Sequence, residues 1–184
     1  MGNQNHYNGF SNRYNPGGVG AADFQDNTKV LRGCIVGAPT TASTIATATP
    51  AHDFNVNLSA GAIAVDGVVV NVNSAADIDL SNSGSATPIV SGQSIIHCLV
   101  YWRSKGDGAV RSAWVAGTAA LHAVVVRPTI AQIKTALGFS DDVVWLCVGE
   151  TRLKCTGATA VSQEYNNAIS PFDIPDQPMP ILQG

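Results

Sequence analysis

The sequence predicts a mainly β protein, an antiparallel β-sandwich or partly closed barrel with one short helix and extended N- and C-terminal arms. Short runs of alternating apolar and polar residues recur along the middle of the chain, and turn residues rather than helical patterns separate them. A single segment has helical spacing. Both ends lack a regular period and are rich in Asn or Pro, which disfavours packed secondary structure. The 184 residues fit one domain with two arms.

Residues 58–73, LSAGAIAVDGVVVNVN, predict the hairpin around which the rest is organised. Apolar runs flank Asp66-Gly67, and this dipeptide favours a type I′ turn because both of its positions need positive φ. The alternation of side chains then gives the hairpin an apolar core face. Its other face is small or half-polar, which suits a second sheet or a neighbouring subunit. The expected register places Val65 opposite Val68, Ile63 opposite Val70, and Gly61 opposite Val72.

Further strands are expected on both sides of this hairpin. The run at residues 94–103, SIIHCLVYWR, has the strongest strand character and returns across a turn as residues 109–115. The complete set of additional strands is residues 30–36, 53–58, 77–80, 94–103, 109–115, 121–126 and 143–154.

One helix of two to three turns is expected after Pro128. Thr129 and Gln132 have the spacing of a capping box, and Gly138 is suited to end the helix in a left-handed conformation. The apolar positions that fall on one helical face are Ile130, Ile133 and Leu137.

The chain divides into an N-terminal docking arm at residues 1–28, a β domain at residues 29–164 and an extended C-terminal tail at residues 165–184. Neither arm has enough apolar area to offset the entropy cost of ordering by itself. Both carry isolated large apolar side chains, which suit docking onto partner chains. The expected docking residues are Tyr7, Phe10, Tyr14, Phe24, Phe172, Ile174, Met179 and Ile181.

The charge balance limits the classes of partner. Ten Lys and Arg residues against 13 Asp and Glu residues give a formal net charge of −3, which argues against nucleic acid or an anionic membrane as the main partner. The polar N-terminus has no apolar signal region, and no apolar run is long enough to span a bilayer. Synthesis in the cytoplasm is therefore expected.

The sequence predicts no catalytic residue, no cofactor and no metal site. The cysteines, Cys34, Cys98, Cys147 and Cys155, have no CxxC spacing and are expected to be reduced. Cys98 and Cys147 lie in apolar runs, where a free Cys behaves as a small buried hydrophobe. GxGxxG and GxxxxGK[ST] phosphate loops are both missing from the sequence.

Several weak motifs have simpler interpretations. Asp77-x-Asp79 resembles the start of a calcium loop, but Pro88 stands where that loop requires a bidentate Glu. Cys98 and His122 could meet across strands as a catalytic pair, and ordinary burial of both residues is the simpler interpretation. Glu150 is expected to face outward beside Arg152.

The order of motifs resembles small β-rich auxiliary structural proteins of tailed bacteriophages, of the capsid decoration or cement type. The pattern L-S-x-G-x-I-x-V-D-G-x-x-V occupies residues 58–70, and a Val-Tyr-Trp hairpin begins at Val100. Pro128-Thr-Ile-Ala and a closing strand with Val148-Gly-Glu-Thr-Arg-Leu follow. The resemblance covers about residues 30 to 155.

This resemblance implies a non-enzymatic virion protein that binds the outside of a capsid and stabilises neighbouring subunits. The implied partners are the major capsid protein and copies of this chain, as a homotrimer. Such a protein would stabilise the capsid through the area of its contacts and not through a chemical reaction, and the arms would strengthen binding by avidity.

Three alternatives stay open at the level of sequence. The first alternative is a tail, fibre or baseplate component with a receptor- or glycan-binding surface. The aromatic candidates for that surface are Tyr101, Trp102 and Trp114. The second alternative is an enzyme built on Cys98 and His122. The third alternative is a cellular β domain without a virion role.

Overall fold

The structure, a computed structural model, describes residues 28–45, 52–80, 90–104, 108–139, 143–157 and 161–167. Within these ranges the chain is mainly β, as the sequence predicts, with one helix. The first strands are β1 (Lys29–Gly33), β2 (Val36–Gly37), β3 (Thr44–Ile45), β4 (His52–Asp53), β5 (Asn55–Leu58), β6 (Gly61–Val65), β7 (Val68–Val72) and β8 (Ala75–Asp79). They are followed by β9 (Gln93–Ser104), β10 (Arg111–Ala116), β11 (Ala120–Leu121), α2 (Ile130–Leu137), β12 (Val143–Cys155) and β13 (Val161–Asn167).

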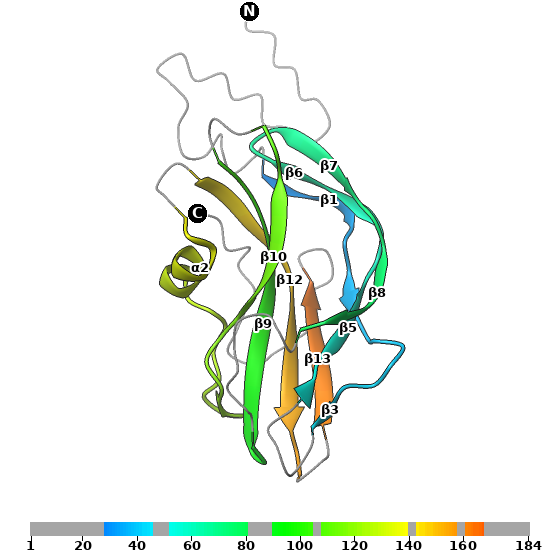
Figure 1. The fold of residues 1–184 in the computed structure, drawn as a ribbon, viewed down its shortest axis with the longest axis vertical. Helices are drawn as coiled ribbons and strands as arrows, with labels where there is room; N and C mark the ends of the chain where they lie inside the picture. The colour runs from blue at the N-terminus through cyan, green and yellow to red at the C-terminus, as the bar shows by residue number, and fades with distance from the viewer. Residues whose placement is uncertain are drawn as a thin grey trace, which may run out of the picture.

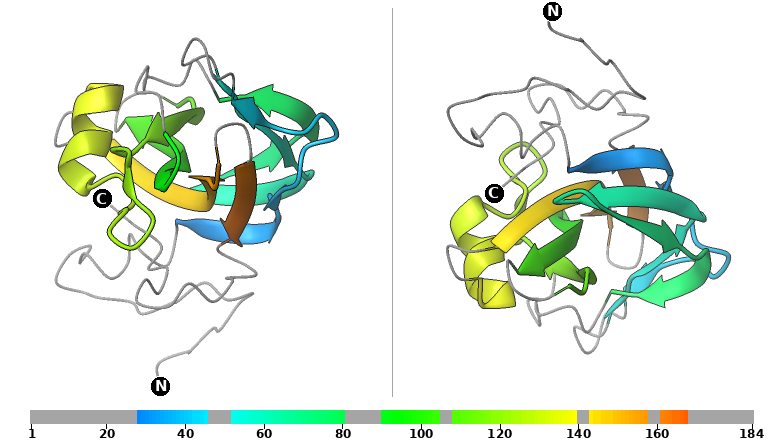
Figure 2. Two further views of the ribbon diagram at one scale, coloured as in Figure 1. Left: turned by 90° about the horizontal axis from the view of Figure 1, so that it is seen from below. Right: turned by 90° about the horizontal axis from the view of Figure 1, so that it is seen from above.

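The strands form a sandwich of one large sheet and smaller sheets (Figures 1 and 2). The large sheet has the order β10-β9-β12-β13, with β11 pairing β9 at one end. Opposite it lie the sheets β1-β6-β7 and β2-β5-β8, together with the ribbon β3-β4. All strand pairs are antiparallel. Within the described ranges the sheets stay separate and do not close into a barrel.

The large sheet buries both of its faces, because β9 and β12 are almost continuously apolar. One face packs against the smaller sheets in a cluster that includes Phe54, Ile63 and Leu146. The other face packs against α2 in a second cluster that includes Ile133 and Trp145. Figure 1 shows α2 on the side of the large sheet that is turned away from β6 and β7.

The predicted central hairpin is confirmed as β6 and β7. Asp66 and Gly67 have φ of 50° and 75°, the positive values that a type I′ turn requires. The Asp66 carboxylate accepts a hydrogen bond of 2.8 Å from Arg103 on β9, which ties the turn to the large sheet. The observed register pairs Val65 with Val68, Ile63 with Val70 and Gly61 with Val72, as predicted.

Two predicted strands are wrong in extent. The run at residues 30–36 is split, because Gly33 and Cys34 both have φ of 57° and turn the chain from one small sheet to another. The run at residues 121–126 contains only the end of β11. Val124 and Val125 both donate their backbone N–H to the Leu121 carbonyl, so the chain turns there.

The predicted helix is confirmed, with one difference. The Thr129 side chain accepts from the backbone N–H of Gln132, and Gly138 ends the helix at φ 64°. Ile133 is fully buried, but Ile130 is 44% exposed. Ile130 therefore does not contribute to the core as its helical spacing predicts.

β13 is a strand that the sequence pattern does not predict, because its residues are mostly polar. Val161 and Tyr165 pack against the sandwich core, and amide side chains make hydrogen bonds across the sandwich. Asn167 accepts from the backbone N–H of Val36 at 2.7 Å and donates to the Val36 carbonyl at 3.0 Å. Gln163 donates to the Asn55 carbonyl at 3.0 Å. These contacts join the edge of the large sheet to β2 and β5.

Asp77 holds the connection between β2 and β3. Its carboxylate accepts from the backbone N–H groups of Thr40 and Thr41 at 2.7 and 2.9 Å, and from the Thr41 hydroxyl at 3.0 Å. The N–H of Thr41 is the main reason that the pKa of Asp77 lies below its ordinary value. Asp77 also has φ of 50°, which Asp and Asn tolerate better than other side chains.

Replacing Asp77 by alanine is expected to speed amide hydrogen exchange at Thr40 and Thr41, because both N–H groups lose their acceptor. Asp77→Asn is the control, since it keeps one oxygen acceptor and the tolerance for positive φ. Because the folded pKa is lowered, protection in the wild type should be full above about pH 4 and should fall as the pH drops through the folded pKa. Unchanged exchange in Asp77→Ala would contradict this role.

Candidate functional site

The predicted docking residues lie outside the described residues. They are Tyr7, Phe10, Tyr14, Phe24, Phe172, Ile174, Met179 and Ile181. Their role stays a prediction, and the candidate sites below come from the described ranges.

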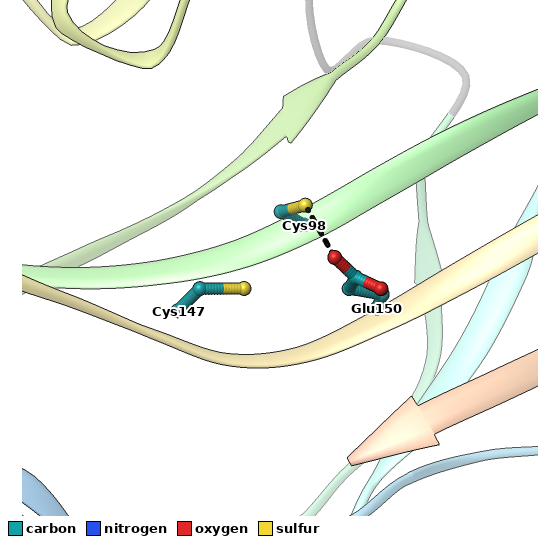
Figure 3. Close-up of side chains that lie close together, drawn as sticks. All are labelled: Cys98, Cys147 and Glu150. Carbon is teal, nitrogen blue, oxygen red and sulfur yellow. Dashed lines mark hydrogen bonds between the residues drawn. The ribbon is translucent and has the colours of Figure 1, made fainter. Parts of the chain in front are cut away.

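Cys98, Cys147 and Glu150 form a buried cluster in the large sheet (Figure 3). Cys98 lies on β9, directly opposite Glu150 on β12. Cys147 and Glu150 are three residues apart, a spacing that would put them on opposite faces of a regular strand. The register shift between Cys147 and Gly149 adds one residue to β12 and brings both side chains to the face that also carries Cys98. The Cys98 thiol donates to Glu150 Oε1 at 3.5 Å.

The carboxylate of Glu150 is neutralised within the fold. Arg127 Nε lies 3.0 Å from Glu150 Oε1, and the exposed fractions of the two side chains are 13% and 4%. Asn166 on β13 donates from Nδ2 to Glu150 Oε2 at 3.2 Å. The expectation that Glu150 faces outward is therefore wrong, because both faces of the large sheet are covered and the shift in register places Glu150 on the α2 side, beside Cys98. No spacing in the sequence joins Arg127 to Glu150, so this pair appears only in the tertiary structure.

The Cys98 thiol stays protonated at neutral pH. The hydrogen bond with Cys147 is the main cause that raises the pKa of Cys98 well above its ordinary value, and burial and the Glu150 charge raise it further. All four cysteines are free and buried. The sequence predicts burial for Cys98 and Cys147, and Cys34 and Cys155 are buried as well. A neutral thiol is a poor nucleophile, so the cluster by itself does not have the properties of a catalytic cysteine.

Protein stability is expected to fall above about pH 9. Burial raises the pKa of Cys34, Tyr101 and Tyr165. The pKa of Cys98 is also raised, mainly by its hydrogen bond with Cys147. The unfolded chain loses these protons near the ordinary values of 9.0 for Cys and 10.0 for Tyr. At higher pH it therefore binds fewer protons than the folded chain, so the free energy of unfolding decreases until the raised folded pKa values are passed.

Urea unfolding at a series of pH values measures this effect. The contribution of these groups should be constant below about pH 9, and Cys98→Ser should make the alkaline decrease less steep. An unfolding free energy that stays constant well above the ordinary Cys and Tyr pKa values would contradict the expectation.

The alternative catalytic pair does not form. His122 Nδ1 lies 2.6 Å from the hydroxyl of Ser94, and Cys98 lies among the α2-side apolar residues. His97 and Cys98 point to opposite faces, as expected, because the His97 ring packs edge-on against Phe54 in the sandwich.

The aromatic residues considered for glycan binding are divided between the two faces. Tyr101 is 7% exposed and belongs to the sandwich core. Trp102 points the other way and packs against Phe139, with ring centroids 5.5 Å apart. Trp114 is half-buried against the sandwich core. These three side chains therefore do not make one stacking platform.

An exposed apolar segment connects β11 to α2. Its large side chains are 44–63% exposed, except for the buried Val125, which lies between the exposed Val124 and Val126. The segment is held to the large sheet by the Arg152 side chain, which donates to the His122 carbonyl. We call Leu121, Val124, Val126 and Ile130 the exposed apolar segment.

A shallow hollow of about 380 Å³ lies over β1, β6 and β7. Its floor is the close approach of two backbones, where a Cβ added to Gly61 would lie 2.4 Å from the Arg32 carbonyl oxygen. Arg32 is the one charged residue among those that line it. The hollow therefore brings no acid and base together.

Comparison of the chain with protein-family models, with curated proteins and with solved structures finds no match. None of the described segments forms a helix with the length and apolar character needed to cross a bilayer.

Proposed function

We propose that this chain is a non-enzymatic virion structural protein that binds the outside of a phage capsid and bridges neighbouring capsid subunits. The proposal rests on the motif order at residues 58–70, 100–117, 128–131 and 148–153, which resembles capsid decoration proteins. Its partners are the major capsid protein and other copies of this chain, and its location is the virion.

The observation that carries the proposal is the exposed apolar segment. Val124 is 63% exposed and Leu121 is 61% exposed, on a domain that otherwise buries most of its large aliphatic side chains. Neighbouring apolar side chains left in water favour association with another protein surface. Burying them removes apolar area from water at about 25 cal/mol per Å² before the costs of association are counted.

A bridging protein also needs a domain that keeps its shape under load. The described sheets are held together by polar contacts as well as by the core. Arg103 on β9 joins the Asp66 turn, and Asn167 and Gln163 on β13 join β2 and β5. Such links between sheets resist sliding of one layer over the other, which supports a mechanical role.

The experiment adds purified protein to phage shells that lack this chain and measures occupancy and the temperature at which the shells release DNA. Full-length protein is compared with Leu121→Ser/Val124→Ser/Val126→Ser and with a deletion of residues 1–28. Val69→Ser is the matched control, because Val69 is 55% exposed on β7, on the other side of the sandwich.

Binding by the wild type and by Val69→Ser, with loss of binding by the triple variant, would support capsid contact through the exposed apolar segment. Loss of binding by the deletion with its β fold intact would assign an anchoring role to the N-terminal arm. Absence of binding by every form would overturn the proposal. Glycan-array binding by the same protein would then favour the tail or baseplate alternative.

A further inference from the structure

The three ligand atoms of the buried cluster have the spacing of a metal site. Cys98 Sγ, Cys147 Sγ and one carboxylate oxygen of Glu150 all lie within 4.8 Å of one another. A tetrahedral zinc ion with bonds of about 2.3 Å to sulfur and about 2.0 Å to oxygen separates a sulfur and an oxygen ligand by about 3.5 Å. The distance from Cys98 Sγ to Glu150 Oε1 is 3.5 Å.

We propose that Cys98, Cys147 and Glu150 bind a zinc ion inside the large sheet. The remaining separations are at most 4.8 Å, so a shortening of no more than about 1 Å brings the two sulfur atoms to the spacing of about 3.8 Å that tetrahedral zinc sets. The inference is independent of the proposed virion role.

The charges around the cluster fit a divalent ion. Two thiolates and one carboxylate carry three negative charges, which Zn²⁺ and the neighbouring guanidinium of Arg127 balance. Zinc binds thiolates, so binding releases thiol protons and should be favoured by higher pH.

The donor types select the ion. Thiolates favour zinc over calcium and magnesium, which take oxygen ligands, and a carboxylate is a common zinc ligand. Arg127 contacts the Oε1 atom as well, which leaves the carboxylate able to bind an ion, since each oxygen has two lone pairs.

Asn166 is the candidate for the fourth position. It is 1% exposed and already lies against Glu150 through its Nδ2 atom. Its Oδ1 atom is buried and has no hydrogen-bond partner among the described residues. A buried amide oxygen without a partner is costly, and a zinc ion beside Glu150 would give it one. Structural zinc sites are almost always four-coordinate and tetrahedral, so the three ligands leave one position to fill.

The experiment uses the full chain, reduced and treated with a chelator. Because the site is buried, Zn²⁺ is supplied both to the folded protein and during refolding from urea. The expected result is one ion per chain and a melting temperature that rises with Zn²⁺ concentration. Co²⁺ in place of Zn²⁺ should give a thiolate-to-metal charge-transfer absorption band, which ligands without sulfur do not produce.

Serine variants assign the ligands. Cys98→Ser and Cys147→Ser should each weaken zinc binding by more than about 100-fold, because loss of a group that only orients a metal ligand already costs about 10–100-fold. Cys155→Ser is the matched control, because Cys155 is also buried and its Sγ atom donates to the Gly157 carbonyl, a bond that a hydroxyl can keep. Melting without metal shows whether each variant folds.

Absence of the charge-transfer band in the wild-type protein would overturn the proposal without reference to any variant. Zinc affinity that survives both serine substitutions would overturn it as well, since the ion would then be held elsewhere on the chain. If Cys155→Ser lowers zinc affinity as much as Cys98→Ser does, the metal is held by nonspecific thiol binding.

Discussion

Replacing Glu150 by alanine is expected to lower the free energy of unfolding by about 3–5 kcal/mol. Glu150 is 3% exposed, and its carboxylate accepts hydrogen bonds from Cys98 and Asn166 and pairs with Arg127. Alanine removes this carboxylate from the guanidinium of Arg127 and from the Asn166 amide. Removing one partner of a buried ion pair costs more than removing both, because the remaining charge loses its compensation.

Urea unfolding of reduced, chelator-treated protein measures this effect without any contribution from metal. Arg127→Met combined with Glu150→Met is the matched control, since it removes both charges and keeps comparable side-chain volume. The double variant should recover most of the stability lost in Glu150→Ala. A loss below about 1 kcal/mol in Glu150→Ala would show that the carboxylate is not a buried partner of Arg127.

Replacing Asn167 by alanine is expected to cost about 2–4 kcal/mol of unfolding free energy. In an antiparallel pair, successive residues point their backbone N–H and carbonyl groups alternately toward and away from the partner strand. The Ile35 carbonyl accepts from Ser59 N–H, so the backbone groups of the next residue, Val36, point away from β5. The Asn167 amide bonds both groups, at 2.7 and 3.0 Å. Val36 is 1% exposed, so alanine leaves its backbone groups buried without these partners.

Gly149 provides a second test of the same contact. A Cβ added at Gly149 would lie 2.7 Å from Val36 Cγ2 and 3.0 Å from Asn167 Oδ1, so Gly149→Ala should displace the amide and destabilise the fold in the same direction. Ser162→Ala, an exposed change on β13, is the control and should stay within about 0.5 kcal/mol of wild type. If Asn167→Ala and Ser162→Ala unfold at the same urea concentration, Asn167 does not join the sheets.

The central hairpin and the helix could be predicted because their signals are local. Asp66-Gly67 selects the turn by its backbone preferences, and that turn sets the register of β6 and β7. Thr129 and Gln132 cap the helix through contacts three residues apart, and Gly138 ends it. Each of these interactions lies within a few residues of chain, so a pattern in the sequence is enough to specify it.

β13 and the ends of the first predicted strand depend on distant parts of the chain. β13 is polar because Asn167 and Gln163 bond the backbone of β2 and β5, more than 100 residues away in sequence. Alternation of apolar residues does not detect a strand in which amides take half of the inward positions, alongside Val161 and Tyr165. The break at Gly33 follows from the need to leave one sheet and join another.

The sequence by itself determined the mainly β class, the Asp66 hairpin, the capped helix and the long strands β9 and β12. The tertiary structure alone decided that Cys98, Cys147 and Glu150 meet. Period-two alternation places Cys147 and Glu150 on opposite faces, and one extra residue in β12 reverses this. The position of such a bulge depends on how β12 pairs with β9, which is a contact between distant segments. Arg127 pairs with Glu150 on the face to which the bulge assigns the carboxylate.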